Sequence, residues 1–135
     1  MAKTTLYKNL IVTISLLDEN FSRLITLGQV KSLKEAVDVI DISGLKNRVE
    51  KFSPFVDKVI DDIISRPENY AAADIDYLLK EVDWSLQQCN SYLALLKRVK
   101  GTTDANALTD PRTFAALTIY KGCLEKIVDK LNYIS

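Results

Sequence analysis

The chain has 135 residues, of which 47% are hydrophobic and 27% charged, an ordinary composition for one globular domain over residues 1–135. Its 18 basic and 18 acidic residues cancel, and neither sign gathers into an arm or tail that would steer the chain to nucleic acid or to a membrane. Histidine is absent, which removes the usual general base and the commonest metal ligand. We therefore expect a protein that is not an enzyme and that uses no cofactor or metal.

The first predicted helix runs from about Thr5 to Leu27. Gly28 follows as a helix stop, and the apolar residues recur every three or four positions: Leu6, Leu10, Ile14, Leu17, Phe21 and Leu24. The beginning of the chain has the lysines and the apolar stretch of a signal peptide, but acidic residues follow directly and no cleavage pattern is present. No apolar run approaches the roughly 18 residues of a membrane span, so no membrane association is expected.

A short helix is predicted after the first one. Ser32 and Glu35 form a capping-box pattern, in which each side chain bonds the backbone amide of the other residue. This pattern predicts a helix from Leu33 to about Asp41. The two-residue alternation of apolar side chains in residues 37–42 leaves an extended segment as the alternative.

The next helix is predicted to begin after Ser43 and Gly44. Its apolar line consists of Leu45, Val49, Phe52, Val56, Val59, Ile60 and Ile63. Pro54 lies inside this line, and proline lacks an amide hydrogen and crowds the preceding turn. The helix is therefore either kinked there or divided, with Ser53 as the cap of a second segment. Pro67 predicts that this helix ends after Arg66.

A long helix from about Asp74 to Val99 carries two apolar faces. The predicted core line is Ile75, Leu79, Val82, Leu86, Cys89 and Leu93. At 100° per residue, Tyr77, Trp84 and Leu95 lie about 180–200° from this line, and Tyr70 continues the seven-residue spacing toward the N-terminus. Because Pro67 leaves the start of the helix open, Tyr70 is the weakest member of this second face.

The last helix has clear signals at its beginning. Asp110 is a natural cap and Pro111 fits the first helical position, while residues 101–109 read as a polar linker. The predicted buried line is Leu117, Tyr120, Leu124, Ile127, Val128 and Leu131. Together these elements predict an all-α fold: an antiparallel four-helix bundle with an additional short helix after the first.

Two cysteines, Cys89 and Cys123, lie 34 residues apart without a metal-binding spacing. We expect two reduced, partly buried thiols and a cytoplasmic location.

Two charged clusters have a functional and an ordinary interpretation. Asp57, Asp61 and Asp62 are a thin carboxylate group for a cation, but Asp62 also has a helical salt-bridge partner in Arg66. The basic residues Lys97, Arg98 and Lys100 suit phosphate, but they also complement the helix dipole at a C-terminus. The ordinary interpretation is the stronger one for both clusters.

The second apolar face gives the function that we expect. Partner-binding residues are predicted to be Tyr70, Tyr77, Trp84, Gln88 and Leu95. Either another element of this chain covers the face or another chain does, since Tyr and Trp are favoured interface residues. We expect a non-catalytic protein that acts through protein–protein contacts, as a self-assembling subunit, adaptor or inhibitor. The alternative is a nucleic-acid-associated accessory subunit that binds through Lys97, Arg98 and Lys100, with Lys121, Lys126 and Lys130.

Overall fold

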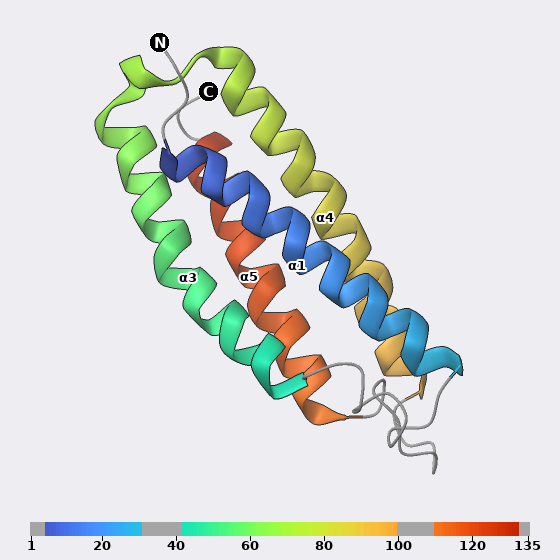
Figure 1. Ribbon diagram of the computed structural model, residues 1–135. Coiled ribbons are helices and arrows are strands. Elements are labelled where there is room, and N and C mark those ends of the chain that lie inside the picture. The colour runs from blue at the N-terminus through green and yellow to red at the C-terminus, as the bar shows by residue number, and fades with distance from the viewer. Residues whose placement is uncertain (1–4, 31–41, 100–109, 133–135) are drawn as a thin grey trace.

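The computed structural model describes residues 5–30, 42–99 and 110–132. This part of the chain forms four α-helices and one 3₁₀ helix, without a strand (Figure 1). The elements are α1 (Thr5–Val30), α3 (Ile42–Ser65), η1 (Pro67–Asn69), α4 (Ala72–Val99) and α5 (Pro111–Asn132). The predicted all-α four-helix bundle is confirmed, whereas the short helix over residues 33–41 and the linker over residues 101–109 lie outside the described residues.

Most helix boundaries lie close to the predicted ones, with one correction, at Gly28, and one open alternative decided, at Pro54. Gly28 does not end α1, which continues to Val30. Pro54 does not divide α3, because the helix runs through it with the proline side chain on the exposed surface. A proline inside a helix removes one backbone hydrogen bond, and the apolar face on either side of Pro54 stays buried in the same core. Pro67 marks the predicted boundary and begins η1.

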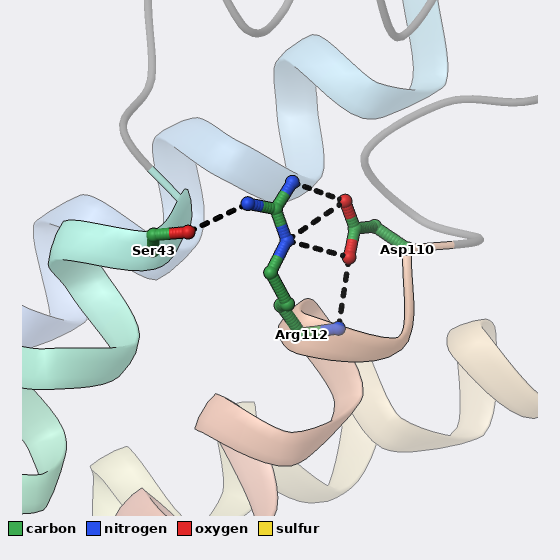
Figure 2. A network of polar contacts seen from close by, with 3 residues as sticks. All are labelled: Ser43, Asp110 and Arg112. Atoms are coloured by element: carbon green, nitrogen blue, oxygen red, sulfur yellow. Dashed lines mark hydrogen bonds and ion pairs between the residues drawn. The ribbon is translucent and has the colours of Figure 1, made fainter.

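The first turn of α5 is fixed by Asp110 and Arg112 (Figure 2). The backbone amide of Arg112 donates to Asp110 Oδ1 at 2.8 Å, which is the predicted capping bond. The guanidinium of Arg112 returns to the same carboxylate, with 2.7 Å between Nη2 and Oδ2, and its Nη1 donates to Ser43 Oγ at 2.6 Å. The hydrogen bonds from Arg112 hold the pKa of Asp110 below its usual value. This cluster joins the beginning of α5 to the beginning of α3.

Consecutive helices alternate in direction, but the helices that are neighbours in space include parallel pairs (Figure 1). α1 and α5 lie on opposite sides of the bundle, each between α3 and α4. Tyr7 Oη donates to the carbonyl of Asp74 at 2.8 Å, and Ser85 Oγ donates to Asp18 Oδ2 at 2.6 Å, and both pairs are 67 residues apart. A constant separation in sequence means that α1 and α4 run in the same direction at a fixed axial level.

α3 and α5 form the second parallel pair. Arg112 bonds Ser43 at a separation of 69 residues, and Lys126 Nζ donates to Ser53 Oγ at 3.2 Å, at a separation of 73 residues. The most extensive packing in the bundle is that of α5 against α3 and α4. α1 touches its two neighbours less closely, so its flanks are the more open sides of the molecule.

The core lies between the four helices and holds the apolar line of each. It includes three aromatic rings from three helices, with centroids of Phe21 and Tyr120 at 5.2 Å and of Phe52 and Tyr120 at 5.9 Å. Among the described residues, no helix combines the length and the hydropathy that a membrane span needs.

Candidate interaction surfaces

One partly buried carboxylate links three helices of the bundle. Asp18 on α1 accepts hydrogen bonds from Ser85 Oγ on α4 and from Tyr120 Oη on α5, both at 2.6 Å. Burial raises the pKa of Asp18, although the two hydrogen bonds oppose this rise. Burial and the Asp18 charge also raise the pKa of Tyr120, so its hydroxyl stays a donor. The three side chains of this network bond one another at the edge of the core, which gives the network a structural role: it fixes the axial level of α1.

The two cysteines are buried and free, in agreement with the prediction of reduced thiols. Burial raises the pKa of Cys89 to about 12, and the nearby Asp18 charge acts in the same direction. Burial also raises the pKa of Cys123, and a hydrogen bond with Ser53 partly opposes this shift. Thiols that stay protonated at neutral pH are weak nucleophiles and weak metal ligands.

The buried face of α4 is rotated from its predicted position. The buried side chains are Leu78, Val82, Ser85, Cys89, Leu93 and Leu96. Ile75, Leu79 and Leu86, which belong to the predicted line, are only partly buried. At 100° per residue the rotation is about 45°. The physical reason for the rotation is Ser85. A search for apolar residues does not select this polar residue, yet it faces the core because its hydroxyl donates a hydrogen bond to Asp18.

Tyr77 and Trp84 project from the outer surface of α4, where they are 48% and 54% exposed. Seven residues are close to two helical turns, so the two rings lie on one line along the helix. We name this pair the aromatic ridge. Within the described part of the chain, the ridge is exposed to solvent. The contact of a partner with this surface stays a prediction.

The other predicted partner-binding residues lie elsewhere or deeper. Tyr70 is buried: its ring centroid lies 6.1 Å from that of Tyr7, and its hydroxyl donates to Asp62 Oδ2. It is therefore a core residue in the turn between η1 and α4 and does not belong to the ridge. Leu95 is partly buried and packs against the core, and Gln88 has intermediate exposure.

An apolar groove runs between α1 and α3. Its volume is about 630 Å³, and it is lined from Asn9 to Asn20 on α1 and from Arg48 to Phe55 on α3. Two α1 side chains at its edge, Val12 and Leu16, are 56% and 55% exposed. Leu17, Phe52 and Phe55 form the rest of its apolar lining. The charged residues that line it are Arg48 and Lys51, with no acidic residue among the described lining, so we name it the basic-rimmed groove.

The basic residues proposed for phosphate binding do not gather at one place. Lys97 and Arg98 are in the last turn of α4, and Lys130 is in the last turn of α5. Because α4 and α5 run in opposite directions, these turns lie at opposite ends of the bundle (Figure 1). Lys126 is engaged by Asp57 Oδ1 at 2.7 Å, and Lys100 lies outside the described residues.

The acidic cluster of α3 is divided between structural partners. Asp57 pairs with Lys126, and Asp62 pairs with Arg66 at 3.9 Å as the sequence predicted. Asp62 also accepts the Tyr70 hydroxyl. Within residues 5–30, 42–99 and 110–132, no three potential metal-ligating side chains of Asp, Glu, Cys or His gather in one place.

Sequence reasoning found the ridge but missed the groove and the buried network. The sequence does indicate Val12 and Leu16 as outward-facing apolar residues, since they lie on the side of the first helix away from its apolar line. No sequence pattern indicates that Arg48 and Phe55 line the groove, because their place beside α1 depends on which helices are neighbours. Comparisons with protein-family models, with curated proteins and with solved structures give no match for this chain.

Proposed function

We propose that this chain is a non-catalytic protein that acts through protein–protein contacts, with the aromatic ridge of α4 as its contact surface. The observation that carries the proposal is the exposure of Tyr77 and Trp84, each about half exposed on one line of the same helix. Trp and Tyr are enriched among the residues that dominate binding energy at protein interfaces. Both combine a large apolar body with a polar tip, which suits a surface that is wet in one state and covered in another.

The area that the two rings expose supports this assignment. A Tyr or Trp side chain buries about 150–250 Å², so two half-exposed rings leave on the order of 200 Å² for a partner to cover. At about 25 cal/mol per Å², covering this area provides about 5 kcal/mol before the costs of association. An area of this size is too small for a whole interface, so further residues around the ridge must take part. The two rings are then the centre of the interface.

The test uses the full chain as bait for proteins from its native source, identified by mass spectrometry. Trp84→Ala and Tyr77→Ala remove the ridge, and Phe114→Ala is the matched control because Phe114 is an exposed aromatic residue on α5. We expect the original chain and the control to retain the same partner, which includes another copy of the chain. Each ridge variant is expected to retain at least about tenfold less, the effect of losing about 1.4 kcal/mol of binding.

Thermal unfolding of the same variants separates an interface from an internal contact. Because both rings are about half exposed, we expect Trp84→Ala and Tyr77→Ala to melt within a few degrees of the original chain. A large loss of melting temperature would instead mean that the chain covers its own ridge, and the proposal would then be wrong. Undiminished partner retention by both variants would contradict it equally.

A further inference from the structure

We propose that the aromatic ridge of one copy seats in the basic-rimmed groove of a second copy, in a dimer whose two-fold axis runs parallel to the helices. This inference rests on the proposed function, since it names a partner for the same ridge. Each copy then offers one ridge and one groove, and both contacts form twice.

The first support is the position of the two surfaces on either side of α1. The groove lies between α1 and α3. The ridge lies on the flank of α4 next to α1: Ser85 faces Asp18 of α1, and Trp84 and the buried Cys89 lie on opposite sides of Ser85 around the helix. Burial raises the pKa of Tyr7 on α1 to about 12, and the nearby carboxylates of Asp74 and Glu81 on α4 act in the same direction. Ridge and groove therefore flank one helix on the same side of the bundle, the side where α1 lies in front in Figure 1.

The second support is symmetry. When two copies meet through their α1 sides around an axis parallel to the helices, α4 of each copy faces the α1/α3 side of the other. Such an axis leaves the level along the bundle unchanged, so a ridge meets a groove only if both lie at the same level in one copy. The contacts are then isologous and close the assembly at two copies.

The ridge and the groove lie at the same level along the bundle. α1 and α4 are parallel at a separation of 67 residues, fixed by the hydrogen bonds of Tyr7 with Asp74 and of Asp18 with Ser85. This separation places Tyr77 level with Leu10 and Trp84 level with Leu17. The groove extends along α1 from Asn9 to Asn20, so the whole ridge falls within its length. At 1.5 Å per residue, the groove is about 16 Å long and the ridge about 10 Å.

The third support is charge. Arg48 and Lys51 line the groove, while the acidic residues near the ridge are Asp76, Glu81 and Asp83. Lys80 is the one basic residue in the same stretch of α4, which leaves the ridge acidic overall. Opposite charges of the two surfaces favour their encounter and fix its register. The chain has a net charge of zero, so two copies do not repel each other as whole molecules.

The centre of this dimer is apolar. Val12 and Leu16 lie between groove and ridge and are more than half exposed, so the two-fold axis brings both pairs together. The contact strip is only about 16 Å long, which places the buried area at the lower end of specific interfaces. We therefore expect a reversible dimer whose population depends on concentration.

The experiment measures the mass of the purified full chain by sedimentation velocity at concentrations from about 1 to about 500 μM. We expect a shift from 15.2 kDa to twice that mass as the concentration rises. Trp84 is the single tryptophan, so its emission reports on the ridge without a label. The emission is expected to move to shorter wavelength over the same concentration range, because the ring leaves water.

Three variants test the geometry, after circular dichroism has shown that each is folded. Trp84→Glu removes the ridge and Leu16→Glu places a charge at the edge of the groove, and each is expected to weaken dimerisation by about 100-fold or more. Phe114→Glu is the matched control, because Phe114 is an exposed residue of α5, the helix diagonally opposite α1, and it is expected to leave dimerisation unchanged. An equal mixture of the first two variants retains one intact ridge and groove per pair, so it is expected to form more dimer than either variant alone.

Other outcomes overturn the proposal in distinguishable ways. A dimer that Leu16→Glu leaves intact would mean that two ridges contact each other. A mass that grows beyond two copies would mean an open head-to-tail chain. A monomer at every concentration would exclude self-association, and the proposed function would still stand if the bait experiment retained a different protein through the ridge.

Discussion

Tyr120 donates a hydrogen bond of 2.6 Å to the carboxylate of Asp18, a residue 102 positions earlier in the chain. The same hydroxyl lies 3.2 Å from the carbonyl of Ile14 on α1. The bond crosses the bundle between the two helices that lie diagonally opposite, α1 and α5. It is thus a polar contact that joins α1 to α5 across the bundle.

Replacing Tyr120 by Phe is expected to lower the free energy of unfolding by about 1–3 kcal/mol. The change keeps the ring that packs against Phe21 and Phe52 but removes one of the hydrogen bonds to a partly buried carboxylate. Urea unfolding measures the effect. Tyr7→Phe is the control, because Tyr7 donates to a neutral carbonyl and its loss is expected to be smaller. Equal losses in the two variants would contradict a special role for Asp18.

The stability of the protein is expected to depend on pH through Asp18. Burial raises its pKa in the folded state above the value of 3.8 for an unperturbed group, so the folded protein retains this proton where the unfolded chain has lost it. The contribution of Asp18 to the free energy of unfolding is therefore largest below pH 3.8 and falls as the pH rises through the folded-state pKa.

Asp18→Asn isolates this contribution from that of all other groups. Asparagine can accept from Tyr120 and donate to Ser85 without a charge, so we expect the variant to be at least as stable as the original chain at neutral pH. Its advantage is expected to grow from about pH 4 and to become constant above the folded-state pKa. The difference between the two proteins in urea unfolding at about eight pH values gives the curve. An advantage that shrinks as pH rises would show that the ionised carboxylate stabilises the fold.

The thiols of Cys89 and Cys123 are expected to resist modification in the folded protein. Both are buried and both have a raised pKa, about 12 for Cys89, so little thiolate forms at pH 8. Titration with a thiol reagent is expected to show slow reaction in buffer and rapid reaction of both groups in denaturant. Fast labelling of either cysteine in buffer would disagree with this burial.

Gly122→Ala is expected to raise the free energy of unfolding by about 0.5–1 kcal/mol. Gly122 lies within α5 on an exposed surface, and a Cβ added there meets nothing within 4 Å. Alanine gains because it restricts the unfolded chain and favours the helix. Thermal unfolding measures the change. Because Gly122 is not part of the proposed dimer contact, the oligomeric state is expected to stay the same; a loss of stability would mean that α5 needs this position empty.

Much of the fold follows from the sequence by itself. Periodic apolar residues and local signals such as the Asp110 cap and Pro67 determine where helices form, because these interactions join residues within a few positions. The outward line of Tyr77 and Trp84 also follows from helical period alone. The same local rules were wrong about Gly28 and left Pro54 undecided, since tertiary packing can carry a helix past a weak stop.

Only the tertiary structure decided which helices are neighbours and at what level they meet. The parallel pairing of α1 with α4 makes Ser85 a core residue, turns the buried face of α4 and places Tyr70 in the interior. The same pairing sets the ridge level with the basic-rimmed groove, whose α1 and α3 walls come from separate parts of the chain. The physical reason is that a helix fixes the directions of its own side chains, whereas its rotation and level are set by contacts with helices far away in sequence.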